Sequence, residues 1–118
     1  MTVDMKALNE LMEVIGNDYD SLLELVDSFL EDAPELISAM ERGLESGDTQ
    51  TVTRSAHTLK SGARDFGLLE LSECCLLLEQ KGKSGTLDDA NRLVSETAAL
   101  FQQGREEIKI AVLKFSDH

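Results

Sequence analysis

The chain has 118 residues and a formal net charge of −12 at pH 7, and its length suits one domain with its own hydrophobic core. Nucleic acids and anionic membranes are bound through large basic patches, so this charge argues against both as partners. Aromatic residues make up only 4 % of the chain and proline occurs once. A composition rich in Leu, Ala and Glu and poor in β-branched and aromatic residues predicts an all-α protein.

Apolar residues recur every three or four positions along most of the chain, which predicts a series of amphipathic helices. Pro34 is expected to open a helix, because its missing N–H is harmless in a first turn. Gly104 is expected to bend the last helix or to divide it in two, and residues 82–85 are expected to form a turn. The predicted helices cover approximately residues 4–15, 18–31, 34–46, 48–65, 69–81 and 86–115.

The connections between these helices are short, so consecutive helices should be antiparallel neighbours. We therefore expect an up-and-down four-helix bundle made of the third to sixth predicted helices. The first two, residues 4–15 and 18–31, are then extra N-terminal helices packed across one end. Since the sequence contains no repeat, low-complexity segment or linker, residues 1–118 are expected to form a single domain.

Segment 54–67 is locally positive in this acidic chain. Between Asp48 and Asp65 there is no acidic residue, although three basic residues occur there. On a helix that turns by about 100° per residue, the apolar residues of this segment lie opposite His57. The imidazole is therefore predicted at the centre of the solvent-facing side. The side chains that lie within about 60° of it by this spacing are Gln50, Thr53, Arg54, Lys60, Ser61 and Arg64.

An exposed imidazole with cations one helical turn away suits the transfer of a phosphoryl group. Imidazole is largely neutral near pH 7 and is then a competent nitrogen nucleophile. A phosphorylated ring carries about two negative charges, which Lys60 can balance with help from Arg54 or Arg64. The small residues 61–63 leave room for the backbone of another protein. The alternative is that these are ordinary surface cations and that His57 has no role, and the spacing alone leaves both interpretations open.

Other kinds of site lack the residues that they require. The sequence contains no Gly-x-Ser-x-Gly motif of a hydrolase and no glycine loop for ATP phosphates. The positions three and four residues from His57 hold no metal ligand. Cys74 and Cys75 lie in a leucine-rich helix and are expected to be buried thiols in a reducing compartment. His118 has no cationic neighbours and is expected to be a frayed end.

The sequence shows neither a signal peptide nor an apolar run long enough to cross a membrane, so a cytoplasmic location is expected. It also shows no exposed apolar stretch that would demand a dimer, so a monomer is expected.

Residues 56–63, Ala-His-Thr-Leu-Lys-Ser-Gly-Ala, resemble the signature of histidine-containing phosphotransfer (HPt) domains. That signature is commonly Ala-His-x-Leu-Lys-Gly-Ser, with a glycine ten residues after the histidine, where this chain has Gly67. The resemblance extends over roughly residues 20–82. One position departs from the pattern, because Ser61 stands where the family usually has glycine. We expect this change to be tolerated, with an effect on partner choice or on the lifetime of the phosphoryl group.

The resemblance implies a phosphocarrier of a multistep phosphorelay in two-component signalling. A phospho-aspartate on a receiver domain, which supplies Mg²⁺, would give its phosphoryl group to His57, and a second receiver would remove it. Without an ATP site, the protein is expected to be a carrier rather than an enzyme, with no cofactor of its own. His57 is the expected phosphoacceptor and Lys60 the countercharge. The residues expected to bind partners are Gln50, Thr53, Arg54, Ser61, Gly62, Arg64 and Gly67.

Receiver domains are the expected partners, together with a hybrid sensor histidine kinase. Two other functions remain as alternatives. The first is a helical adaptor that binds a receiver or kinase through the same face without accepting phosphate, although the presence of His57 favours the carrier. The second is a bundle with a buried metal or cofactor, which would need ligands that face inward. The start at Met1 and a complete set of predicted helices favour a free-standing protein over a piece of a sensor kinase.

Overall fold

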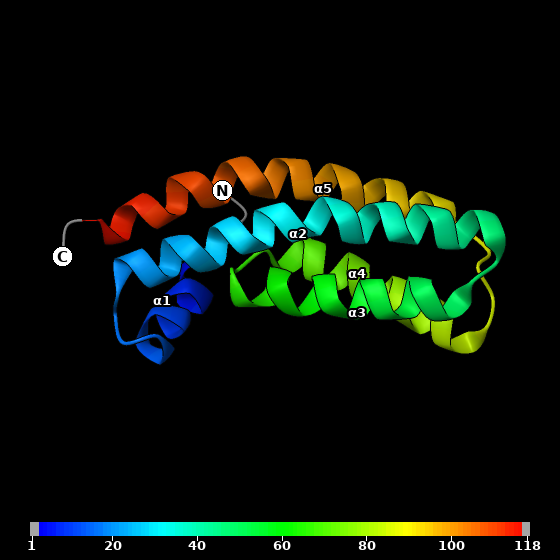
Figure 1. Ribbon diagram of the computed structural model, residues 1–118, viewed down its shortest axis with the longest axis horizontal. Helices are drawn as coiled ribbons and strands as arrows, with labels where there is room; N and C mark the ends of the chain where they lie inside the picture. The colour runs from blue at the N-terminus through cyan, green and yellow to red at the C-terminus, as the bar shows by residue number, and fades with distance from the viewer. Residues whose placement is uncertain (1–2, 117–118) are drawn as a thin grey trace.

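The computed structural model describes residues 3–116, which form a bundle of long helices with a short helix across one end (Figure 1). Helices α2 to α5 form the bundle, and α1 packs at the end where the chain begins. The expected all-α four-helix bundle is confirmed. His118, which was expected to be a frayed end, lies outside the described residues. The elements are α1 (Met5–Val14), α2 (Tyr19–Ser46), α3 (Thr49–Asp65), α4 (Leu69–Ser84), α5 (Ala90–Ala111) and the 3-10 helix η1 (Val112–Phe115).

Helix α2 is continuous through Pro34, so the prediction of two helices in residues 18–46 was wrong. One N-terminal helix, α1, therefore crosses the end of the bundle instead of two. A proline inside a helix costs about 3 kcal/mol, since a backbone hydrogen bond is lost. Each large side chain that is buried along the helix contributes about 1.5–3 kcal/mol. Several such side chains together therefore outweigh the cost of the proline. The buried residues recur every three or four positions on both sides of Pro34: Leu22, Val26, Phe29, Ala33, Ile37, Met40 and Gly43.

The N-terminal segment is tied to the loop between α3 and α4. Asp4 accepts a hydrogen bond from the backbone N–H of Lys6 and so caps α1. Its own N–H donates to the carbonyl oxygen of Gly67 at 2.8 Å, and Val3 forms a β-bridge with Leu68. Gly67 has a φ of +77°, and a Cβ there would lie 2.5 Å from the carbonyl oxygen of Asp4. Glycine is required here both by the turn and by the close approach of the two segments.

The ends of the last two helices differ from the predicted ones. Helix α4 continues to Ser84, so residues 82–84 belong to it rather than to a turn. Gly85 caps the end of the helix with a φ of +80°. Helix α5 begins at Ala90 instead of residue 86. Gly104 does not divide α5. It is buried against Leu68, where an added Cβ would lie 3.0 Å from the leucine methyl groups.

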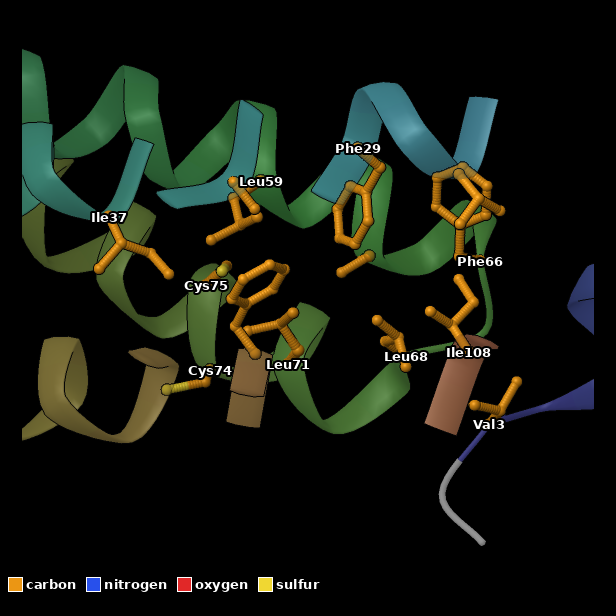
Figure 2. Packing of buried hydrophobic residues seen from close by; sticks show 14 of the residues in the cluster. Val3, Phe29, Ile37, Leu59, Phe66, Leu68, Leu71, Cys74, Cys75 and Ile108 are labelled. Carbon is orange, nitrogen blue, oxygen red and sulfur yellow. The ribbon is translucent and has the colours of Figure 1, made fainter. Parts of the chain in front are cut away.

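The core lies between the four long helices and includes three phenylalanines in contact, two of which, Phe29 and Phe66, are labelled in Figure 2. The ring of Phe29 lies 5.0 Å from that of Phe66 and 6.0 Å from that of Phe101, between centroids. Cys74 and Cys75 are buried, as predicted. Burial raises the pKa of the Cys75 thiol to about 12, so this thiol stays protonated and unreactive near neutral pH. In the described part of the chain, no helix is long and apolar enough to span a bilayer.

Candidate functional site

Helix α3 presents His57 to solvent because its opposite side is buried in the core. Asp48 caps the helix by accepting hydrogen bonds from the backbone N–H of Thr51 at 3.1 Å and from its hydroxyl at 2.6 Å. The imidazole is 60 % exposed, which confirms its predicted position on the solvent-facing side. The residues of α3 that face the core are Val52, Ser55, Ala56, Leu59 and Ala63.

The exposed imidazole is bound from one side by a buried carboxylate of the neighbouring helix. Nδ1 of His57 lies 2.9 Å from Oε2 of Glu79 on α4, although the two residues are 22 positions apart in the chain. The side chain of Glu79 is only 6 % exposed. The contact fixes how the ring is turned, since a hydrogen bond to a buried partner restricts the rotation of an exposed side chain.

Glu79 binds two lysines in addition to the imidazole. Nζ of Lys60 lies 2.6 Å from Oε1, and Nζ of Lys83 lies 3.2 Å from Oε2, the oxygen that also binds His57. Hydrogen bonding from Lys60, and then from Lys83 and His57, lowers the pKa of Glu79 to about 2 even though burial opposes the shift. Glu79 is therefore ionised near neutral pH.

The charge of Glu79 determines which ring nitrogen of His57 carries the proton. An ionised carboxylate can only accept hydrogen bonds, so Nδ1 of the neutral imidazole must be the donor. The other nitrogen, Nε2, then carries the lone pair. Within the described residues Nε2 has no hydrogen-bond partner. The arrangement therefore provides an exposed, oriented nitrogen nucleophile with two cations held beside it.

The two small residues after Lys60 have different surroundings. The hydroxyl of Ser61 donates to the carbonyl oxygen of His57 at 3.2 Å, one helical turn back. Gly62 lies against the ring of Phe29, where an added Cβ would be 2.8 Å from a ring carbon. Gly62 thus allows α2 and α3 to approach closely beside the site. A groove of about 320 Å³ lies at this junction, and its lining includes Leu25, Leu36 and Thr58.

The structure brings some of the predicted partner-binding residues to the surface around His57 and places others elsewhere. Gln50, Arg54 and Arg64 are exposed on α3. Thr53 is half-buried, and its hydroxyl donates to the carbonyl oxygen of Thr49 at 2.7 Å at the contact with α4.

Gly67 is not part of this surface. It is buried under the N-terminal segment, ten residues from His57, or about 15 Å along a helix.

Sequence reasoning missed Glu79 and Lys83, which complete the site from α4. The local pattern of α4 contained one signal. Glu79 follows Leu71 and Cys75 at intervals of four residues, so a carboxylate occupies the apolar side of the helix. A buried acidic residue needs a cationic or hydrogen-bonding partner. The pattern alone does not say that the partners are Lys60 and His57.

Residues 24–108 match the family model of the Hpt domain, and the chain therefore belongs to the Hpt domain family. The crystal structure of histidine-containing phosphotransfer protein B (HptB) from Pseudomonas aeruginosa is similar over 96 % of both chains. The TM-score of that comparison is 0.84 and the sequence identity is 27 %.

Two curated proteins are also similar in sequence. The chain is 24 % identical to Multistep phosphorelay regulator 1 of Schizosaccharomyces pombe over 83 % of its length, and 29 % identical to Sensor protein TorS of Escherichia coli over 73 %. It spans 34 % and 9 %, respectively, of the length of these relatives. Family and relatives together support the role of a phosphocarrier in a phosphorelay.

Proposed function

We propose that this protein accepts a phosphoryl group on Nε2 of His57 from a receiver-domain phospho-aspartate and passes it to a second receiver domain. The observation that carries this proposal is the contact of Nδ1 with Glu79. It leaves Nε2 unprotonated and directed away from the carboxylate, on a ring that is 60 % exposed. A partner can therefore reach the nucleophile without any rearrangement of the bundle core.

The transfer needs few groups from this chain. Nε2 attacks phosphorus, the bond from phosphorus to the aspartate oxygen breaks, and the aspartate leaves as a carboxylate. The ring becomes positively charged, and the hydrogen bond from Nδ1–H to Glu79 stabilises that charge. In the return step, an aspartate of the second receiver attacks phosphorus and the bond to Nε2 breaks. We propose that Mg²⁺ is supplied by the receiver, so that this chain acts as a carrier without a cofactor and without kinase activity of its own.

Lys60 contributes a positive charge that is held in place. Its ammonium group is bound to Glu79 at 2.6 Å and its side chain is 19 % exposed, so it moves less than a surface lysine. A phosphoryl group on His57 carries about two negative charges on its oxygens, which a fixed cation nearby balances. Lys60 therefore acts as a countercharge from a position set by Glu79.

Receiver domains and a sensor kinase are the proposed partners, and the exposed side of α3 is the proposed docking surface. The positive side chains of Arg54 and Arg64 lie there, on a protein that is otherwise acidic. The acidic pocket around a receiver's aspartate would be attracted to them. The groove lined by Gly62 and Thr58 offers apolar contact area between α2 and α3. We propose that the protein docks as a monomer through a small interface, which suits a short-lived complex.

Transfer from a radiolabelled phospho-receiver to the wild-type chain and to the His57→Gln variant tests this proposal. The wild-type chain should gain a label that is labile in acid and stable in base, as a phosphohistidine is. The variant should gain none while its circular dichroism stays unchanged, because the side chain is exposed. A labelled variant would remove His57 from its role. Receivers that bind the wild-type chain without labelling it would instead favour the adaptor.

A further inference from the structure

Lys83 shares one carboxylate oxygen with the proposed phosphoacceptor. Its Nζ lies 3.2 Å from Oε2 of Glu79, and Nδ1 of His57 lies 2.9 Å from the same atom. The two nitrogens are therefore separated by no more than the sum of these distances, which is about 6 Å. A lysine side chain on its flexible stem covers such a distance by rotation about its own bonds.

The two lysines at Glu79 differ in how firmly they are held. The side chain of Lys60 is 19 % exposed, whereas that of Lys83 is 67 % exposed. The contact of Lys83 is also the longer of the two, at 3.2 Å against 2.6 Å. Exposed ion pairs of this kind contribute little to stability. Lys83 is thus the cation that can leave Glu79 most easily, while Lys60 stays and keeps the carboxylate paired.

We propose that Lys83 is a mobile second countercharge, which leaves Glu79 to bind the phosphoryl oxygens on His57 and thereby prolongs the life of the phosphohistidine. This inference rests on the proposed function. A phosphoryl group on Nε2 carries about two negative charges and three acceptor oxygens, and an ammonium group offers three donors. When Lys83 moves, Oε2 of Glu79 serves the imidazole alone.

The effect on lifetime follows from the chemistry of hydrolysis. Water attacks phosphorus, the bond from phosphorus to Nε2 breaks with its electron pair returning to the ring, and inorganic phosphate leaves. The transition state is loose, so negative charge on the phosphoryl oxygens helps to expel the leaving nitrogen. In the phosphohistidine these oxygens carry about two negative charges, whereas they carry less in the loose transition state. A cation paired with them therefore stabilises the phosphohistidine more than the transition state and slows the step. Removal of Lys83 should therefore accelerate the loss of phosphate.

The experiment uses phosphoramidate, a small phosphoryl donor that requires no partner protein and releases ammonia on transfer. Wild type, Lys83→Gln, Lys83→Arg and Lys109→Gln are loaded, freed from the donor, and followed by ³¹P NMR as the phosphohistidine decays. Lys109→Gln is the matched control, because it removes the same charge and another surface ion pair, that with Glu106 on α5. His57→Gln shows which signal comes from His57.

We expect the phosphohistidine of Lys83→Gln to decay about two to five times faster than that of wild type at low salt. Lys83→Arg should restore the wild-type lifetime, and Lys109→Gln should leave it unchanged. The difference should shrink as salt is added, since an exposed ion pair is screened. A merely structural role of Lys83 would lower the thermal stability of Lys83→Gln without accelerating the decay of its phosphohistidine.

The outcomes separate the two proposals. If wild type accepts no phosphoryl group on His57 from either phosphoramidate or a phospho-receiver, the proposed function and this inference both fail. If wild type is labelled on His57 but Lys83→Gln decays no faster, only the role of Lys83 is overturned. An equally fast decay of the phosphohistidine in Lys109→Gln would also overturn the role of Lys83, because the change in net charge alone would then explain the effect.

Discussion

The ammonium group of Lys60 lies 2.6 Å from Oε1 of Glu79, and this ion pair joins α3 to α4 beside the exposed imidazole. The same carboxylate binds His57 and Lys83 through its other oxygen. One buried acidic side chain therefore orients the proposed nucleophile and holds two cations near it. Replacing Glu79 should change both the stability of the bundle and the chemistry of the ring.

Glu79→Gln should destabilise the protein at neutral pH by about 1–3 kcal/mol. The pKa of Glu79 is lowered from 4.5 to about 2 in the folded protein. Its ionised form therefore contributes stability that is fully present above pH 4.5 and is lost as the pH falls towards 2. Urea unfolding of both proteins between pH 7 and pH 2 should show their free energies converging at the acid end, where the protonated side chain resembles glutamine.

Glu73→Gln is the control for this measurement, because Glu73 is exposed on the same helix. All other carboxylates are common to the three proteins, so their contributions cancel when the free energies of unfolding are subtracted. A gap between wild type and Glu79→Gln that stays constant down to pH 2 would contradict the role of the ionised carboxylate.

Glu79→Gln should also slow the acceptance of phosphoryl groups by His57, by about three- to tenfold. A glutamine amide can present either its oxygen or its NH₂ group to the ring, so the preference for a proton on Nδ1 is weakened. Two-bond ¹H–¹⁵N NMR spectra of the ring report the tautomer, and loading by phosphoramidate reports the rate. A slower rate with an unchanged tautomer would show that Glu79 acts by another route.

Pro34→Ala should stabilise the protein by about 1–2 kcal/mol. Pro34 is exposed inside the continuous helix α2, and alanine restores the backbone donor for the helix. The gain is reduced because the unfolded chain becomes more flexible without proline. Chemical unfolding should be compared with that of Ser38→Ala, an exposed substitution one turn further along α2. Lower stability of Pro34→Ala would mean that the bundle depends on the local geometry of the proline.

Gly82→Ala should destabilise the contact between α3 and α4 by about 1–2 kcal/mol. An added Cβ would collide with the hydroxyl of Thr53 and lie 3.1 Å from the carbonyl oxygen of Thr49. Alanine is the better helix former, which offsets only part of this cost. A double-mutant cycle with Thr53→Ala should show positive coupling, because the second change removes the colliding hydroxyl. Additive free energies would show that the helices simply move apart.

Local sequence patterns were sufficient for the all-α class and the approximate positions of most helices, and for the side of α3 that faces solvent. His57 lies opposite Leu59 and Ala63 in any α-helix, since the angle between side chains on one helix depends only on their spacing. The burial of Cys74 and Cys75 followed in the same way from the leucines around them. Pro34 misled the prediction because the cost of a proline is local, while the burial that outweighs it comes from contacts with other helices.

Only the tertiary structure determines which side chains contact His57. Spacing within α3 places the imidazole on the surface, but it does not determine how far α4 slides or rotates against α3. That register is set by close contacts between the helices, such as Gly82 against Thr53. It brings Glu79 within 2.9 Å of the ring and within 2.6 Å of Lys60. The exposed position of the imidazole could thus be predicted from sequence alone, whereas its orientation and the cations beside it arise from packing between residues far apart in the chain.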